Sequence, residues 1–422
     1  MRQQPSQHKQ LLQAASTAAF FMMFDSENES DSDLEDYFSF CQHQYQKQYL
    51  TARGSTTQFH PQYDLSTIQS LPESCFLQLF RMSWPCFLNL LHLIEPDPIF
   101  YIQSHNPQWD VSIQLAIATC HLGSNGNGAA VFRLKNLFQV GYGKINLYTI
   151  QVIKVIYNMQ SKLASWPTQE EQLELSQVMQ EEGFPGCIGF VDGTTIPLSQ
   201  KPPIDGNHYF DCKKRSGVLN FFFISNSETA LYWLPHPIFN RYSISLTLVC
   251  DVNKKFTSYL AGYPGSCHDS YVFSNMQIAQ HPKKFFDQNQ FLLANSAYAS
   301  DQYTIPAYKG KELLNRWNVD FNYRLAQSQV RIEHAIGVLK GQFSSLRELR
   351  TQIRNRKEMK VTIKWIISCV VLHNLLADLK DQWNELYEED EPELAPVVGD
   401  NYANSNDGIR GILRPLTLAH FE

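Results

Sequence analysis

The chain has 422 residues, 43% of them hydrophobic, and a formal net charge of −6. This length allows two folded domains with flanking tails, and the hydrophobic share is ordinary for a globular protein. No apolar run reaches the length of a membrane span. Nine cysteines without a Cys-x-x-Cys pair favour free thiols in a reducing compartment over a disulfide framework or a structural zinc site.

Residues 1–65 are predicted to be a disordered, acidic tail. The segment is rich in Gln, Ser and His, and a run of acids extends from Asp25 to Asp36. Such a composition buries too little apolar surface to offset the entropy of the chain. A solvated tail is therefore the simplest interpretation of this segment.

Residues 70–168 are predicted to be helical. Apolar residues recur every three or four positions, and further helices are expected over 111–122, 129–138 and 144–163. A glycine-containing turn joins the last two, and lysines on the final helix fit a helix-turn-helix that binds DNA. An ordinary helical bundle is the alternative, and the pattern alone favours the bundle.

The second half of the chain alternates strands with helices and predicts an α/β domain. The apolar run 187–191 reads as a strand that ends at Asp192, after which we expect the chain to turn at Gly193. Asn295 also follows a short apolar strand, and Glu333 lies in a helical run. Acids or an amide at strand ends, together with an acid on a helix, predict a cluster for hard divalent cations.

Six ordered sequence blocks support a more specific interpretation. They are Gly189–Thr194, Gly262–Ser270, Leu292–Tyr298, Phe321–Arg324, Arg331–Lys340 and Leu372–Asn374. Together they resemble the nuclease domain of PIF/Harbinger-type transposases over residues 185–377, and the helical region before them is similar to that family's helix-turn-helix part. The resemblance implies an RNase H-like α/β fold with a DDE triad that binds two divalent metal ions, Mg²⁺ or Mn²⁺, and cuts DNA.

The resemblance also exposes a departure at the triad. The first acid corresponds to Asp192 and the glutamate to Glu333, but the position of the second acid is Asn295. An amide offers one neutral oxygen where Mg²⁺ prefers anionic ones. We therefore expect a weakened nuclease, or alternatively an inactive, domesticated relative that binds DNA or protein. Because amide and carboxylate are nearly isosteric, Asn295→Asp should restore DNA nicking while barely changing stability.

Two other acids could lie near the triad. Asp269 matches a position in the family's blocks and is expected to support the site or to add a metal ligand. Asp251 follows a strand that should neighbour the Asp192 strand, so it could approach the site. A turn-forming role for Asp251 is the favoured interpretation.

Basic residues gather next to the expected site. Residues 309–364 contain thirteen Lys and Arg against five Asp and Glu. A charge run is usually a solvated face, but beside a carboxylate cluster it suits phosphate binding. The predicted DNA-binding strip comprises Lys340, Arg347, Arg350, Arg354 and Arg356.

The remaining expectations concern an insertion, the C-terminal segment and partners. The aromatic stretch 216–241 interrupts the family pattern as an inserted hairpin or as translated non-coding sequence. Residues 378–422 are predicted to be an acidic, mostly disordered tail. The resemblance implies a DNA partner, a separate Myb-like DNA-binding protein and a location in the nucleus, and it allows an oligomer.

Overall fold

The computed structural model of the chain describes residues 65–101, 108–129, 131–202, 206–209, 242–351, 353–381 and 408–421. The predicted tail over 1–65 lies outside these ranges except for its last residue. The predicted insertion 216–241 lies outside them entirely. The fold is described for the remaining residues.

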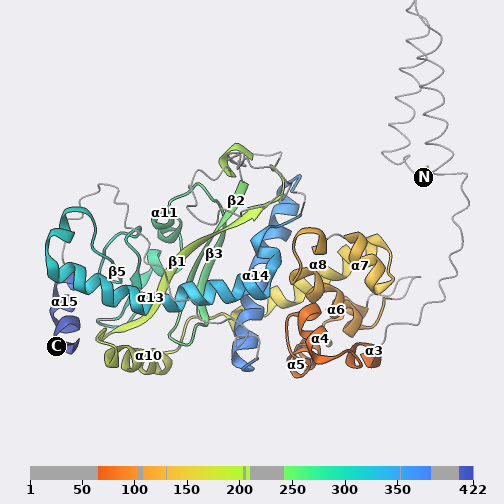
Figure 1. The fold of residues 1–422 in the computed structure, drawn as a ribbon, viewed down its shortest axis with the longest axis horizontal. Coiled ribbons are helices and arrows are strands. Elements are labelled where there is room, and N and C mark those ends of the chain that lie inside the picture. Colours follow the sequence, from red (N-terminus) through yellow and green to blue (C-terminus); the bar gives the residue numbers. More distant parts are fainter. Residues whose placement is uncertain are drawn as a thin grey trace, which may run out of the picture. The chain divides into compact units, whose positions relative to one another are not determined.

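A five-stranded mixed sheet forms the centre of the predicted α/β domain (Figure 1). Its strands are β1 (Cys187–Leu198), β2 (Tyr242–Cys250), β3 (Phe256–Pro264), β4 (Phe291–Ala294) and β5 (Thr304–Pro306). Their order is β3-β2-β1-β4-β5, with antiparallel pairing of β1, β2 and β3 and parallel pairing of β1, β4 and β5. The sequence predicted this mixed α/β class.

The strand that carries Asp192 is longer than predicted. Asp192 pairs with Leu248 in the middle of β1, and pairing with β2 continues to Leu198 opposite Tyr242. The predicted turn at Gly193 is therefore wrong, because β2 supplies a hydrogen-bonding partner along the whole second half of β1. The parallel partner β4 ends opposite Val191, so Asp192 lies one residue beyond the end of β4.

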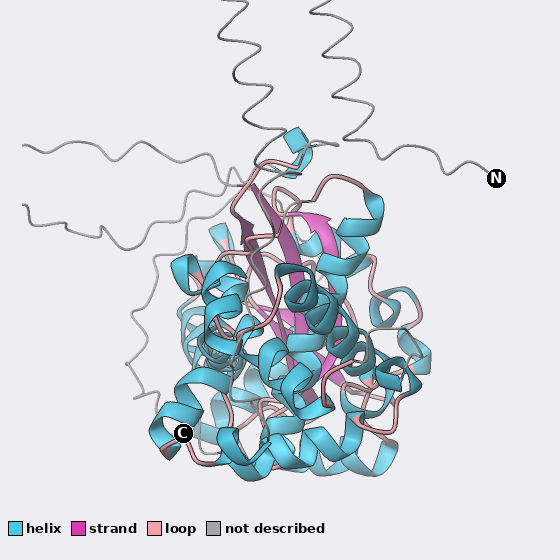
Figure 2. Cartoon of the chain, turned by 90° about the vertical axis from the view of Figure 1, so that its right-hand side faces the viewer, coloured by secondary structure: helices cyan, strands magenta, loops and turns pink. Residues whose placement is uncertain are grey.

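Helices cover both faces of the sheet (Figure 2). The long helices α13 (Arg316–Gln342) and α14 (Arg356–Asp378) share a core with Phe190 and Ile196 of β1. The short helices α11 (Asp269–Ser274) and α12 (Gln277–Gln280) belong to a second cluster with Val191. Successive side chains of a strand point to opposite faces, so Asp192 and Thr194 lie on the α13 side with Phe190.

The helical region before the sheet contains eight α-helices among the described residues. They are α3 (Leu65–Gln69), α4 (Glu73–Phe80), α5 (Trp84–Ile94), α6 (Val111–Leu122), α7 (Val131–Phe138), α8 (Tyr142–Asn158), α9 (Gln160–Leu163) and α10 (Gln169–Glu181). The bounds of α6 are those predicted, and its start is fixed by the Asp110 side chain, which accepts a hydrogen bond from the Ser112 N–H. The described 3₁₀ helices are η2 (Pro98–Tyr101), η3 (Gly126–Ala129), η4 (Gly206–Tyr209), η5 (Pro282–Lys284), η6 (Gly310–Leu314) and η7 (Ser344–Arg347).

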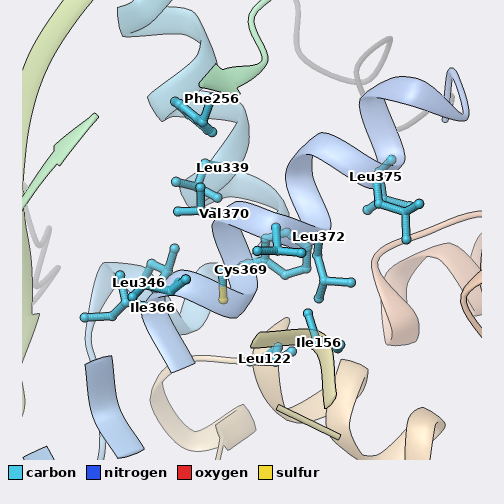
Figure 3. Packing of buried hydrophobic residues seen from close by; sticks show 14 of the residues in the cluster. Leu122, Ile156, Phe256, Leu339, Leu346, Ile366, Cys369, Val370, Leu372 and Leu375 are labelled. Carbon is cyan, nitrogen blue, oxygen red and sulfur yellow. The ribbon is translucent and has the colours of Figure 1, made fainter. Parts of the chain in front are cut away.

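This helical region and the sheet are built on one hydrophobic core (Figure 3). Leu122 of α6 and Ile156 of α8 lie against Cys369 and Leu372 of α14 in that view. The Ser368 hydroxyl of α14 also donates to the Ile153 carbonyl of α8 at 3.0 Å. Most of the side chains of α8 are thus buried in the core, and only its exposed side could contact a partner.

The Leu-His-Asn block at the end of α14 fastens the two regions together. The Asn374 side chain accepts from the Phe256 N–H and donates to the Phe256 carbonyl, at 2.8 and 2.7 Å. Its amide also donates to the Leu163 carbonyl at 2.7 Å. The buried Asn374 amide therefore connects α14 to β3 and to the end of the helical region. These bonds need both a donor and an acceptor, which the amide of an Asn supplies.

Helix α14 is the only described helix long and apolar enough to cross a membrane, but most of it is buried inside the protein. Its apolar character is that of a core helix. The cysteines in the described ranges are all free.

The segment predicted as a C-terminal tail contains one more helix, α15 (Gly408–Phe421). Buried Arg410 pairs with Glu312 at 2.5 Å, and its guanidinium lies 3.9 Å from the Tyr308 ring centroid. Leu413 is buried, and the Thr417 hydroxyl donates to the Gly183 carbonyl. This part of the predicted tail is therefore a docked helix, because its apolar and arginine side chains find partners on the nuclease-like domain.

Candidate active site

The centre of the candidate site is a hydrogen bond between the first acid and the amide that replaces the second. The Asn295 Nδ2 donates to the Asp192 Oδ1 at 2.8 Å. The Asn295 Oδ1 accepts from the Ala297 N–H at 2.9 Å. This second bond fixes the orientation of the amide, because a flipped amide would set its NH₂ group against a backbone donor. The amide must therefore present a donor, not an oxygen, to Asp192.

The same Asp192 oxygen is also held by its own strand. The Gly193 N–H donates to the Asp192 Oδ1 at 2.7 Å. This carboxylate oxygen thus accepts two N–H donors, from Gly193 and from Asn295. Both bonds favour the ionised carboxylate without a metal ion.

Helix α13 packs against β1 and carries Glu333. Near its middle, the Arg331 guanidinium pairs with Glu182 and lies 5.8 Å from the Phe190 ring centroid. Further on, the Lys340 Nζ donates to the Thr194 Oγ1 at 2.5 Å. Along α13, Glu333 precedes Lys340 by about 10 Å. Along β1, Asp192 precedes Thr194 by about 7 Å.

Glu333 lies on the helix stripe that borders this region. Residues 333, 337 and 340 fall on one side of α13. A Cβ added at Gly337 would meet no atom within 4 Å, so the space beside this stripe is open. Partial burial raises the pKa of the Glu333 carboxyl above its usual 4.5, although its side chain reaches solvent.

Asp269 approaches from the other side of β1. A Cβ on Gly193 would lie 2.7 Å from the Asp269 carboxyl carbon. Gly193 is therefore required for this close approach and not for a turn. Tyr298 lies nearby with a buried hydroxyl that has no hydrogen-bond partner among the described residues. Burial and the negative charges of Asp192 and Asp269 raise the pKa of Tyr298.

Asp251 takes no part in this arrangement. Its Oδ1 accepts from the Asn253 and Lys255 N–H groups, at 2.8 and 2.9 Å. It follows Cys250, which pairs with Phe190 rather than with Asp192. The turn-forming role that the sequence favoured is confirmed, and Asp251 does not substitute for the second acid.

A lysine that the sequence analysis missed lies on the Asn295 side of the pair. The Lys309 Nζ lies 3.4 Å from the Ser296 carbonyl oxygen. The loop that carries it is held by Asn322, whose side chain bonds both the N–H and the carbonyl of Tyr308. Lys309 lies outside the six recognised blocks, and it is connected to them by its contact with Ser296 and by the bonds of Asn322 to Tyr308.

The chain between Arg347 and Arg350 of the predicted basic strip pairs with the end of β1. The Leu349 N–H donates to the Pro197 carbonyl, and the Ser199 N–H donates to the Leu349 carbonyl. The arginines of the strip, Arg347, Arg350, Arg354 and Arg356, are exposed. Lys340 differs from them, because its ammonium is bonded to Thr194 and to the Thr195 carbonyl.

The side chains of this site fit a divalent metal poorly. Within the described ranges, no group of three or more His, Cys, Asp or Glu side chains could hold a metal ion. The pair offers one carboxylate, and the amide directs its donor at that carboxylate. A bridging metal would have to displace this hydrogen bond and accept a neutral ligand.

Residues 191–374 match the family described as DDE superfamily endonuclease, and this range contains Asp192, Asn295 and Glu333. Over these residues the chain resembles a DDE superfamily endonuclease domain. The strand order and the flanking helices agree with the RNase H-like fold expected of such a domain. Members of this superfamily generally use divalent metal ions.

The chain is also similar to a curated protein. "Protein ALP1-like" of Arabidopsis thaliana is 20% identical over 324 residues, covering 73% of this chain and 71% of the relative. No solved structure matches the chain.

Proposed function

We propose that this protein binds duplex DNA through its DDE domain and cuts it only weakly. The observation that carries the proposal is the hydrogen bond from Asn295 to Asp192. In a two-metal nuclease the metal ions activate the attacking water and stabilise the leaving oxygen of the phosphodiester. Here the proposed site, Asp192, Asn295 and Glu333 with Asp269 beside it, lacks one anionic ligand and directs a donor into the metal position.

The proposed DNA path follows from the position of the basic strip. Lys340 bonds the strand two residues beyond Asp192, and Leu349 pairs at the end of the same strand. Asp192 and Leu198 are about 20 Å apart along β1, a length over which a duplex presents many phosphates. The strip therefore extends from the candidate site along a continuous edge.

A plasmid-nicking assay tests the weak-nuclease part of the proposal. Wild type, Asn295→Asp and Asn295→Asp/Glu333→Gln are compared with Mg²⁺ and Mn²⁺. The single variant should nick supercoiled DNA faster by orders of magnitude, because the second acid returns, and the double variant should lose that gain. Equal rates for wild type and the single variant would refute the role given to Asn295.

Charge reversal tests the DNA-binding part. Arg350→Glu/Arg354→Glu should weaken duplex binding and reduce its salt dependence. The matched control is Lys283→Glu/Lys284→Glu, which changes the charge equally on an exposed 3₁₀ helix away from the strip. Equal binding by the two double variants would show that the strip is only a solvated face.

A second candidate is a relative without nuclease activity that binds DNA or another protein. Phe132 of α7 and Leu147 and Ile150 of α8 are large apolar side chains that are 58, 49 and 44% exposed. Apolar residues on this face favour contact with a protein over base reading by α8. A separate Myb-like DNA-binding protein in the nucleus is the partner that the family resemblance suggests.

A further inference from the structure

The helices α7 and α8 belong to a part of the chain that has no acidic residue. Residues 111–169 contain no Asp or Glu, in a protein whose net charge is −6. The basic residues of this range are Arg133, Lys135, Lys144, Lys154 and Lys162. None of them forms an ion pair with another described residue. The basic charge of this range is therefore not balanced by acids of its own.

The acids that precede the neighbouring elements cap those elements. The Asp97 Oδ1 accepts from the Ile99 N–H at 2.9 Å, and the Asp110 Oδ1 accepts from the Ser112 N–H at 2.8 Å. The elements that follow, η2 and α6, meet α8 on its buried side. Lys144 lies over the Trp109 ring, next to Asp110 in the chain, and is not part of the exposed side of α8 described next.

The exposed side of α8 is an apolar stripe. Tyr142, Ile150 and Tyr157 follow one another at intervals of eight and seven residues, so they lie on one side of the helix, and Leu147 lies beside Ile150. Tyr142, Leu147 and Ile150 are all exposed, and Tyr157 is partly exposed. Helix α7 packs beside α8 (Figure 1), and its exposed Phe132 adds to the apolar surface.

A cation lies at each end of this stripe. The Lys135 Nζ of α7 lies 5.1 Å from the Tyr142 ring centroid, and the Lys364 Nζ of α14 lies 4.7 Å from the Tyr157 ring centroid. Exposed Lys154 lies between the two tyrosines. Along α8, Tyr142 and Tyr157 are about 22 Å apart, which is the length of roughly four helical turns.

We propose that this stripe binds an acidic amphipathic helix of a partner protein. Over four turns, the apolar side of such a helix covers Leu147 and Ile150, and acids near its two ends meet Lys135 and Lys364. A DNA duplex would also meet the cations, but its phosphates would leave the apolar side chains uncovered. This binding role rests on the second candidate function above and adds the chemistry of the partner.

The test measures the binding of a fluorescein-labelled helical peptide to the full chain by fluorescence anisotropy. The peptide has about 16 residues, or roughly four turns, with leucines along one side and glutamates near both ends. Leu147→Asn/Ile150→Asn should weaken its binding about thirtyfold, because each substitution removes an apolar side chain that the peptide covers. The matched control is Leu173→Asn/Val178→Asn, which changes two exposed apolar residues of α10 and should leave the binding unchanged.

A second peptide, with glutamine in place of each glutamate, tests the charges. It should bind the wild type about tenfold more weakly than the acidic peptide, and Lys135→Met/Lys364→Met should bind the two peptides equally. Equal binding of the acidic peptide by the two asparagine double variants would overturn the proposed site. So would a labelled DNA duplex that loses affinity in Leu147→Asn/Ile150→Asn, since the stripe would then be a DNA contact.

Failure of this site and failure of the second candidate function appear in different assays. Plasmid nicking by the wild type would refute a relative without nuclease activity and would leave the peptide results as they are. Absence of binding between the wild type and the acidic peptide would overturn the acidic partner and would leave the nicking rates as they are.

Discussion

Replacing Asn295 by Asp should make the stability of the protein depend on metal ions. In the wild type a neutral donor lies 2.8 Å from the Asp192 Oδ1, and the Ala297 N–H keeps the amide in that orientation. A carboxylate in its place would set two anionic oxygens at that separation. Their repulsion is about 1.5 kcal/mol at the dielectric constant of water and about 6 kcal/mol at an effective value of 20.

Since both side chains are partly exposed, the lower half of this range applies, and we expect a loss of about 2 kcal/mol at neutral pH in EDTA. The near isosterism of amide and carboxylate therefore does not make the exchange neutral, contrary to what the sequence alone suggested. Mn²⁺ or Mg²⁺ should return the lost stability to Asn295→Asp and have no comparable effect on the wild type.

Urea unfolding with and without metal measures this difference. The control is the exchange Asp192→Asn/Asn295→Asp, which retains one acid and one amide and so should keep the hydrogen bond without the repulsion. If Asn295→Asp in EDTA were as stable as the wild type, the amide would not be balancing Asp192, and the reasoning would fail.

Three further predictions concern other ionisable groups. Glu333→Gln should raise the melting temperature at pH 8 but not at pH 4. The raised pKa of the Glu333 carboxyl means that the folded state disfavours its ionised form, so removing the charge stabilises the protein only where the carboxyl is ionised. The same gain at both pH values would contradict this explanation. Burial lowers the pKa of His121 and of His373 from 6.5 to about 4, so each should contribute stability that is lost as pH falls from 6.5 towards 4, up to about 3 kcal/mol per histidine. His373→Gln should flatten the dependence of unfolding free energy on pH in that window, and an unchanged slope would argue against its neutral burial. Arg410→Met should lower the free energy of unfolding by about 2 kcal/mol, because it removes the ion pair with the partly exposed Glu312. Arg414→Met in the same helix should cost less. Equal unfolding curves for the two variants would show that the Arg410 pair does not hold α15 in place.

The elements that the sequence predicted well are those whose pattern is local. Helix α6 was predicted with its observed bounds because its apolar run is followed directly by Gly123, which ends the helix. The length of β1 was not predicted, because the run after Asp192 contains Gly193 and two threonines. This run becomes a strand only through its pairing with β2. Helix α15 follows an acidic run and contains Pro415, and it is held by Arg410 contacts that no local pattern shows.

The candidate site was likewise predicted from the sequence only in part. The sequence blocks predicted that Asn295 lies beside Asp192, and the hydrogen bond between them agrees with this. The orientation of the amide could not be predicted, since the Ala297 N–H that sets it belongs to the turn after β4. Lys309 was missed because its position depends on Asn322, a long-range contact between a loop and a helix. Lys340 was assigned to DNA contact without its bond to Thr194, which only the packing of α13 on β1 creates.

The measurement that bears most directly on this account is Mn²⁺ binding by the purified protein, followed by electron paramagnetic resonance of the free ion. Wild type should leave the Mn²⁺ signal essentially unchanged at concentrations where Asn295→Asp depletes it, because only the variant has a second carboxylate directly beside Asp192. Tight Mn²⁺ binding by the wild type that Asp192→Asn abolishes would contradict the account, since it would mean that Asp192 and Asn295 hold a metal ion as they stand.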